Sequence, residues 1–261
     1  MPKIAPPTRF PDAVALSYYR GMKRLISALK KLSLEVFDEQ IKPEVENYKK
    51  RYDDSTFIED GPLDIIQRAI DIIKGLSLGI FTSSEVQSIA STFVNGVNVF
   101  NISNVKKQGA IKGIDPTAYE PWLQEYMRAS VKENVGYISK LRDDYLIDIE
   151  RIVLQGVKRG HSTKQIRDEL IKRIGLSLSR AEFIAVDQTG TILGQMTAKR
   201  HQQMGVSKFT WVTSKDERVR KTHKELDNKV FSYSDPPTVG KRKVLPGEDY
   251  RCRCVSRPLF D

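Results

Sequence analysis

Apolar residues recur three or four positions apart over most of the first 205 residues, and this spacing predicts a chain built mainly from helices. A basic amphipathic helix is predicted from Asp12 to about Phe37, and Pro43, which cannot continue a helix, ends its register. A second helix is predicted between Pro62 and Gly75, because proline suits the first turn of a helix and glycine its end.

Longer apolar patterns follow between residues 84 and 160. Ser84 and Glu85 open an apolar segment that continues through Val94. The stretch 100–116 mixes Gly, Asn and Lys and is therefore predicted to be a connection. The longest pattern covers residues 121–160, and a helix of that length would span on the order of 60 Å.

Two further helices are predicted between residues 162 and 205. Ser162, three positions before Gln165, has the spacing of a capping box, in which each residue satisfies a backbone amide of the other. Gly175 is expected to close that helix, and Ser177 or Ser179 to cap the next one.

After residue 205 the pattern changes to the alternation typical of strands, in "SKFTWVT" and "LDNKVFSYS". The sequence therefore predicts a mainly α fold with a small C-terminal α+β module. An extended proline-rich arm is expected over residues 1–11, an elongated helical body with long helices over 12–205, and the terminal module over 206–261. The arm either docks on a neighbouring surface or stays mobile.

The chain carries a formal charge of +10, and residues 199–261 hold 15 Lys and Arg against 8 Asp and Glu. Such an excess favours contact with double-stranded DNA, without sequence preference, or with an acidic protein surface. Lys241, Arg242 and Lys243 are candidates for that contact, although charged runs are more often simply solvated. No apolar run is long enough to span a bilayer and no signal peptide is apparent, so we expect synthesis in a host cytoplasm and no membrane span.

Both cysteines of the chain lie in "PGEDYRCRC". In an extended segment Cys252 and Cys254 face the same side, too far apart for a mutual disulfide but suited to a shared metal ion. His223 is the best further ligand, and Asp216, Glu248 or a water is a candidate fourth. Two interpretations stay open: a structural zinc ion, or two small thiols that fill the core of the module beside a hydrogen-bonded histidine.

Other candidate sites have plainer explanations. Asp216 is expected to cap a short helix, although a carboxylate near His223 also suits acid–base chemistry. Gly190 and Gly194, four positions apart on a predicted helix, would let two helices approach closely. The sequence contains no P-loop, dinucleotide fingerprint, nucleophile elbow or HExxH helix, so the common enzyme classes lack support.

The order of residues in the module resembles the phage Mu F-like family of minor head, or head morphogenesis, proteins. The resemblance covers about residues 180–257, and it departs from the family pattern at several positions. Arg220 stands where some family members have the first cysteine of a Cys-x-x-Cys pair, Asn228 where glycine is frequent, and Val186 and Gln188 replace an arginine and a glutamate. The matching motif positions are Trp211, Asp216, Arg218, His223, Leu226, Asp227, Pro246, Cys252, Arg253 and Cys254.

The resemblance implies a structural protein of the virion head or portal vertex of a tailed bacteriophage. Its expected partners are the portal protein, the major capsid protein and packaged DNA, and no catalytic residue is expected. Two alternatives remain: a metal-dependent nuclease or toxin-like enzyme built on the terminal module, and a DNA-binding assembly factor that is not retained in the virion.

Overall fold

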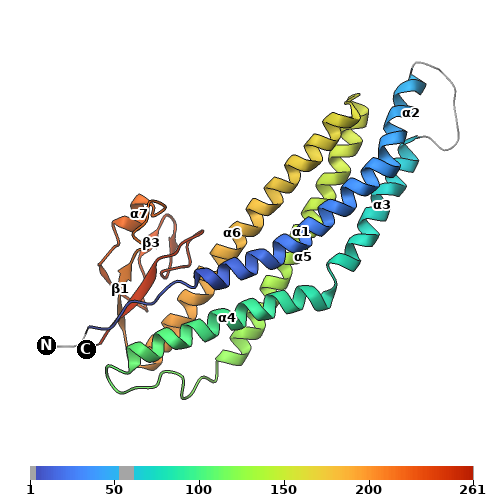
Figure 1. Ribbon diagram of the computed structural model, residues 1–261. Coiled ribbons are helices and arrows are strands. Elements are labelled where there is room, and N and C mark those ends of the chain that lie inside the picture. Colours follow the sequence, from blue (N-terminus) through green and yellow to red (C-terminus); the bar gives the residue numbers. More distant parts are fainter. Residues whose placement is uncertain (1–3, 53–61, 261) are drawn as a thin grey trace. The chain divides into compact units, whose positions relative to one another are not determined.

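The computed structural model describes residues 4–52 and 62–260, and over these ranges the chain is mainly helical with a small strand-containing module at its C-terminal end, as expected (Figure 1). Pro2, which belongs to the predicted arm, lies outside the described residues. The elements are α1 (Asp12–Val36), η1 (Phe37–Ile41), α2 (Lys42–Tyr52), α3 (Pro62–Ile80), α4 (Ser83–Gly109), α5 (Leu123–Lys158), α6 (Thr163–Gln203), β1 (Lys208–Val212), α7 (Lys221–Lys224), β2 (Val230–Ser232), β3 (Thr238–Val239), β4 (Arg242–Lys243) and β5 (Val255–Leu259).

The expectation that Pro43 ends the first helix is wrong. Between α1 and α2 the helix widens into a single π-helical segment, η1, where the backbone N–H of Lys42 donates to the carbonyl of Phe37 five residues earlier. Pro43 then falls in the first turn of α2, where its missing N–H and fixed φ are tolerated. The wider turn lets the helical path continue through a residue that would break a regular α-helix.

Two other helices extend beyond their predicted ends. Gly75 lies inside α3, because α3 continues to Ile80, and no atom would contact a Cβ added at that glycine. The predicted connection is helical as far as Gly109, because Asn101, Asn104 and Gln108 face the interior instead of solvent. Asn101 donates to Thr197 Oγ1 at 2.6 Å, and Gln108 donates to the carbonyl of Pro6 at 2.9 Å.

The long helix predicted over 121–160 is confirmed as α5, and the capping box at the start of α6 is formed as predicted. The N–H of Ser162 donates to Gln165 Oε1 at 2.7 Å, and the N–H of Gln165 donates to Ser162 Oγ at 3.1 Å. The predicted break at Gly175 is wrong, because α6 is one helix from Thr163 to Gln203. Ser177, expected as a cap, is buried in the helix and donates back to the carbonyl of Arg173.

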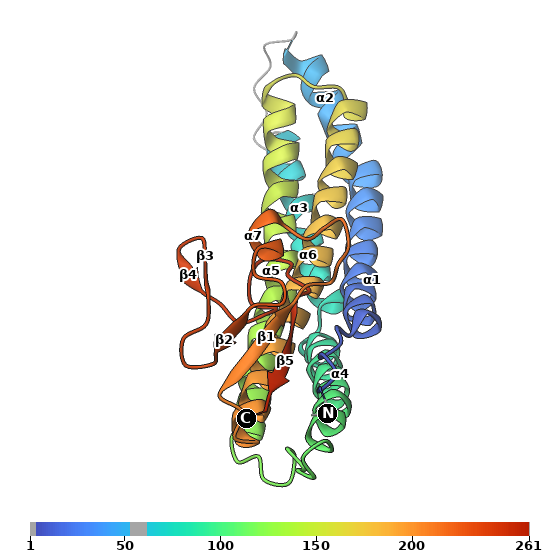
Figure 2. The same ribbon diagram turned by 90° about the vertical axis from the view of Figure 1, so that its left-hand side faces the viewer.

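The terminal module contains a three-stranded antiparallel sheet in the order β2-β1-β5 and a separate two-stranded hairpin, β3 and β4. Both predicted strand segments are confirmed as β1 and β2. Trp211 on β1 pairs with Ser256 on β5, so the strand that follows the two cysteines lies beside the tryptophan strand. Figure 2 shows the β3–β4 hairpin projecting away from the three-stranded sheet.

The described part of the N-terminal arm docks on the module, which was one of the two expected outcomes. The N–H of Thr8 donates to the carbonyl of Ser256 on β5 at 3.1 Å, and the N–H of Arg9 donates to Asn104 Oδ1 on α4 at 3.2 Å. Ala5 and Thr8 are buried in these contacts. The arm thus connects the last strand of the sheet with a helix from the middle of the chain.

The chain divides into two compact units, and α1, α4, α5 and α6 each contribute residues to both. Unit 1 combines residues 1–19, 89–134 and 182–261, so it contains the terminal module and the helix segments that support it. Unit 2 combines residues 20–88 and 135–181, and the apolar stripes of its helices form its core. None of the described helices is both long and apolar enough to cross a bilayer.

Candidate metal centre

The two cysteines and His223 meet inside unit 1. Nδ1 of His223 lies 3.5 Å from Sγ of Cys252 and 3.5 Å from Sγ of Cys254, and the three possible ligand atoms all lie within 4.8 Å of one another. All three side chains are buried, and both cysteines are free thiols. The juxtaposition predicted from the sequence is therefore present in the structure.

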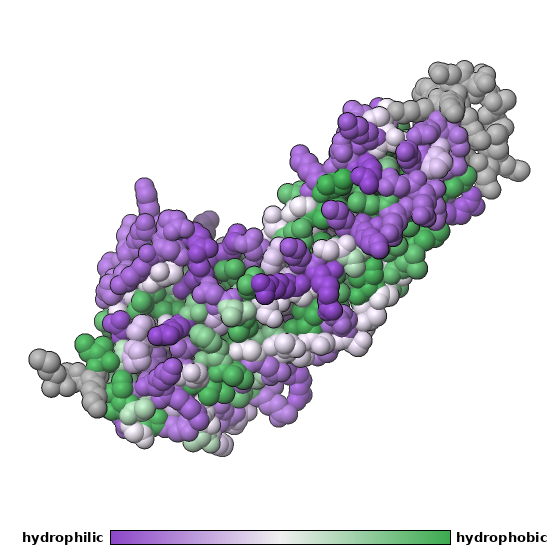
Figure 3. All heavy atoms as spheres, viewed as in Figure 1, coloured by the Kyte–Doolittle hydropathy of each residue, from purple (hydrophilic) through white to green (hydrophobic). Residues whose placement is uncertain are grey.

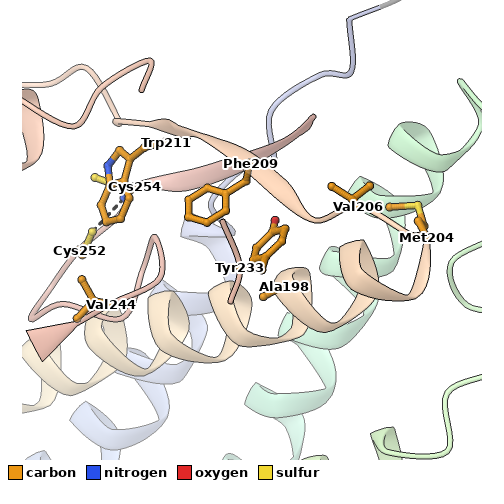
Figure 4. Close-up of a cluster of buried hydrophobic side chains, with 9 residues drawn as sticks. All are labelled: Ala198, Met204, Val206, Phe209, Trp211, Tyr233, Val244, Cys252 and Cys254. Atoms are coloured by element: carbon orange, nitrogen blue, oxygen red, sulfur yellow. Dashed lines mark hydrogen bonds between the residues drawn. The ribbon is translucent and has the colours of Figure 1, made fainter. Parts of the chain in front are cut away.

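The cysteines also belong to the buried hydrophobic cluster of the module. Figure 4 shows Cys252 and Cys254 beside Trp211, with Phe209 and Tyr233 next along the cluster. Their burial agrees with the packing interpretation, but packing alone does not require the two thiols to face one imidazole nitrogen. The geometry of the donor atoms therefore has to distinguish the two interpretations.

Glycines of α6 position the loop that carries the cysteines. A Cβ at Gly190 would lie 2.5 Å from the carbonyl oxygen of Cys252, and one at Gly194 would lie 2.3 Å from that of Pro246. Gly247, at φ +100°, would in turn place a Cβ 2.3 Å from the carbonyl oxygen of Gly190. These glycines were expected to bring two helices together; instead they bring a loop against one helix, because the approaching atoms are loop carbonyls.

A turn directly before the cysteines fixes their direction. Arg251 has a φ of 51°, and the N–H of Cys252 donates to the carbonyl of Asp249 at 2.9 Å. The N–H of Arg251 donates to Asp187 Oδ1 on α6 at 2.9 Å, and its guanidinium pairs with Glu182. Asp187, which the sequence analysis did not single out, therefore anchors this turn to the helix.

Asp249 orients the imidazole of His223. Nε2 of His223 lies 3.0 Å from Asp249 Oδ2, so the imidazole donates there and its Nδ1 lone pair is directed towards the two sulfurs. The guanidinium of Arg220, the residue directly before α7, also binds Asp249, at 2.8 Å, so Arg220 and His223 share this carboxylate. The sequence analysis considered the neighbouring Glu248 instead, and nothing in the spacing distinguishes the two carboxylates.

The thiols and the imidazole shift one another's protonation. A hydrogen bond from Cys254, together with His223, lowers the pKa of Cys252 to about 5, although burial opposes this. The pKa of Cys254 is raised, mainly by the adjacent Cys252 and by burial. Burial would lower the pKa of His223, but the hydrogen bond and charge of Cys252 raise it. The cluster therefore favours a thiolate at Cys252.

Two N–H groups of the module are directed at the sulfurs. The N–H of Cys254 donates to Sγ of Cys252 at 3.3 Å. The indole N–H of Trp211 is buried without a normal hydrogen-bond partner among the described residues, yet it lies close enough to Cys254 to lower the pKa of that thiol. A thiolate at Cys254 would give this orphaned donor an acceptor, whereas a thiol accepts only weakly.

Asp216 does not cap α7, contrary to expectation. The residue before that helix is Arg220, which makes no side-chain cap, while Asp216 accepts the N–H of Arg218 at 3.1 Å within the preceding turn. Its carboxylate also binds the guanidinium groups of Arg218 and Arg253. The carboxylate is therefore used within this turn and in an ion pair with Arg253, which lies between the two cysteines.

Three remaining motif residues stabilise the segment between α7 and β2. Asp227 Oδ1 accepts the N–H of Thr213 at 2.8 Å, and Asn228, which stands where glycine is frequent in the family, has a positive φ of 61° that asparagine tolerates. Leu226 packs against the buried cluster that contains Trp211. These residues fix the segment that presents His223.

The candidate DNA-contact residues occupy the β3–β4 hairpin and are exposed. Arg242 lies over the ring of Tyr250 and 3.4 Å from Asp249, and Lys243 lies 2.5 Å from Asp235. Hydrophilic side chains gather on the surface over α7 and this hairpin (Figure 3). Part of the positive charge of Arg242 and Lys243 is therefore balanced within the module.

A pocket of about 670 Å³ adjoins the cluster, entirely within unit 1. Its wall includes the three possible ligands, and aromatic and charged residues complete it. Phe10, Tyr19, Phe183 and Tyr250 supply the aromatic part, and Arg218, Arg220, Arg251 and Arg253 the basic part. The donor atoms thus lie at the boundary between a buried core and a cavity.

Relatives of the chain are much longer than the region that they share with it. A protein of Haemophilus influenzae, named only as uncharacterized, is 35% identical over 187 residues, which are 69% of this chain and 40% of that protein. The NAD(+)–arginine ADP-ribosyltransferase EFV of Enterococcus faecalis is 26% identical over 133 residues, 47% of this chain and 27% of that protein. An uncharacterized protein of Methanocaldococcus jannaschii is 27% identical over 112 residues, 42% and 17% respectively. The chain thus spans less than half of each of these relatives, and no solved structure matches it.

The sequence pattern of the family described as "Phage Mu protein F like protein" matches residues 147–257. The match begins in α5, upstream of residue 180, where the resemblance was expected to fade. It includes all three residues of the donor cluster and both glycines of α6 that support the loop. Residues 147–257 thus match the phage Mu F-like family, the family that the sequence of the module resembles.

Proposed function

We propose that this protein is a minor head protein of a tailed bacteriophage that acts in head morphogenesis by binding other head proteins. The family match over residues 147–257 carries this proposal. The terminal module, which holds the C-terminal part of the match, is small and positively charged, as suits a protein that works by binding. The portal protein and the major capsid protein are the proposed partners, and the site of action is the portal vertex of the virion.

Packaged DNA is a further proposed partner. Residues 199–261 concentrate positive charge, and Lys241 is exposed at the tip of the β3–β4 hairpin. Contacts to phosphates would be independent of base sequence and would weaken as the salt concentration rises. Because Arg242 and Lys243 already pair with acidic residues, we expect them to contribute less than their number suggests.

An enzymatic role is the second candidate, and one relative gives it support. That relative is named as an ADP-ribosyltransferase, but the shared region is 27% of its length, so the transferase activity of the name need not belong to the shared part. A metal-dependent phosphodiesterase would use the donor cluster and its pocket. The motif match favours the structural role, because the matching family is not an enzyme family.

The two roles differ in where the protein is found. Particles of the phage or prophage that encodes this chain would be purified through two density gradients, and their proteins quantified by mass spectrometry against the portal protein. A constant ratio of a few copies per portal is expected for a minor head protein. Absence from mature particles, with presence in unfinished heads, would instead identify an assembly factor that is not retained. Absence from both would refute the head proposal.

A further inference from the structure

We propose that Nδ1 of His223 and the Sγ atoms of Cys252 and Cys254 bind one zinc ion, whose fourth ligand is a small molecule that enters from the adjoining pocket. Zinc bound tetrahedrally at about 2.3 Å from sulfur and about 2.0 Å from nitrogen sets its nitrogen and sulfur ligands about 3.5 Å apart. Both nitrogen–sulfur distances in this cluster are 3.5 Å. The cluster therefore has two edges of the coordination tetrahedron.

The surroundings of the cluster supply hydrogen-bond donors on the sulfur side and a carboxylate acceptor on the far side of the imidazole, the arrangement in which two cysteines and a histidine bind zinc. The backbone N–H of Cys254 donates to the sulfur of Cys252, and the buried indole N–H of Trp211, which has no hydrogen-bond partner among the described residues, belongs to a side chain beside the two cysteines (Figure 4). Asp249 accepts the remaining imidazole proton, the arrangement that orients most metal-binding histidines. Packing alone gives no reason for all of these groups to converge.

The chemistry of the donors selects the metal. Two thiolates and an imidazole suit zinc, whereas magnesium and calcium require oxygen ligands. The two thiolate charges would balance the charge of Zn²⁺, so the filled site would be neutral. A neutral site can be buried in an apolar cluster without the desolvation cost of an isolated ion.

The nearby carboxylates already have other partners. Glu248 accepts the N–H of Leu245 at 2.7 Å and the amide of Gln195 at 2.9 Å. Asp216 binds two arginines, and Asp249 contacts the opposite nitrogen of the imidazole. The pocket wall includes all three donor residues, so the fourth position faces a cavity in which water, a thiol or an imidazole fits.

The first test needs only the wild-type chain. The chain would be purified under reducing conditions without chelating resin, its zinc measured by elemental analysis, and the metal-free form titrated with cobalt(II). One equivalent of metal per chain is expected, with thiolate-to-cobalt charge transfer and the intense visible bands of four-coordinate cobalt. A chain that holds no zinc and gives no such spectrum would overturn the proposal. If an alkylating reagent also modifies Cys252 rapidly, and added cobalt does not slow that reaction, the cluster would be assigned to thiol chemistry instead.

The open position is tested in the same sample. Added imidazole or a small thiol should shift the visible cobalt bands, whereas unchanged bands at saturating concentration would show a fourth protein ligand and overturn that half of the proposal. Cys252→Ser and Cys254→Ser should each lose the charge-transfer band, while Asp216→Asn and Glu248→Gln should retain it. These results do not depend on the particle analysis, so this proposal and the head proposal can fail separately.

Discussion

Asp249 accepts a hydrogen bond from Nε2 of His223 at 3.0 Å, and this contact leaves Nδ1 as the nitrogen that faces Cys252 and Cys254. In the other tautomer the proton would be on Nδ1, the N–H would point at the sulfurs, and this nitrogen could not bind a metal. The carboxylate is only 12% exposed and also binds Arg220 and Arg242. Orientation of the imidazole is thus controlled from outside the donor cluster.

Replacement of this carboxylate should weaken zinc binding without removing a ligand. In Asp249→Asn we expect the zinc affinity to fall about 10- to 100-fold, because the outer carboxylate no longer holds the imidazole as firmly or raises its basicity. Competition with a fluorescent chelator measures the affinity. Asp235→Asn, which also removes an acidic partner of a hairpin cation, is the matched control and should leave the affinity unchanged. Equal affinities for the wild type and Asp249→Asn would refute the positioning role.

The close approach of the loop to α6 can be tested with a single methyl group. Gly194→Ala places a Cβ 2.3 Å from the carbonyl of Pro246, and we expect a loss of about 1–3 kcal/mol in the free energy of unfolding, the usual cost of overpacking. Urea denaturation followed by circular dichroism gives this value.

A second glycine of the same helix is the control for that substitution. Gly175 is exposed and nothing lies within 4 Å of its added Cβ, so Gly175→Ala should raise the stability by about 1 kcal/mol through helix propensity alone. If both substitutions have the same sign, the contact between the loop and α6 is not the close one described.

His201 should make the folded state sensitive to acid. Its imidazole is buried between Tyr233 and Gln108, and burial lowers its pKa from 6.5 to about 3. Below pH 6.5 the unfolded chain binds a proton at this position while the folded chain does not, so stability is lost as the pH falls towards 3. Between pH 7 and pH 5 we expect a loss of about 2 kcal/mol from this residue.

The measurement is urea denaturation at a series of pH values for wild type and His201→Gln. The variant should be less stable at pH 7 but should lose less stability on acidification. His161→Gln, which changes a less buried histidine of unit 2, should keep the pH dependence of the wild type. Parallel pH curves for the wild type and His201→Gln would count against the role of His201.

Substitutions of Ser162, which directly precedes α6, and of Ser179, which lies inside α6, test which of the two serines caps the start of a helix. Ser162→Ala removes the capping box and should cost about 1 kcal/mol. Ser179, expected as a cap from the sequence, is exposed inside the continuous helix, so Ser179→Ala should instead be neutral or stabilise by a few tenths of a kcal/mol. Thermal unfolding of the two variants compares them directly, and a larger loss for Ser179→Ala would indicate a helix break that the structure lacks.

Local signals in the sequence predicted the helical character, strands β1 and β2 of the module and the capping box, because these depend on residues a few positions apart. The ends of several helices were not predictable in this way. Gly175 and Pro43 commonly end helices, but here long-range packing and one wide turn carry the helix through them. The end of α4 was predicted to be a connection because it contains asparagines, which favour loops. The buried partners that hold Asn101 in the helix, Thr197 and Arg200, lie about 100 positions away in the sequence.

The donor cluster was predictable in part, since the pair of cysteines and the choice of His223 follow from residue type and spacing. The roles of Asp249, Asp187 and Trp211 were not, because each depends on the folded path of the loop across α6. The spacing of Gly190 and Gly194 predicted a close approach to α6, but by a second helix instead of the loop that carries the cysteines. A sequence does not show which part of the chain packs against a glycine.

The hydrogen bond between Thr8 and Ser256 also has a consequence for synthesis of the chain. The two residues lie near opposite ends of the sequence, so the first of them leaves the ribosome roughly 12 to 50 s before the second is made. Throughout that interval the described arm lacks the strand on which it docks. Unit 1 therefore cannot be completed until β5 has been made, and a chain whose translation stops before β5 would present both the arm and the tryptophan strand to quality-control proteases.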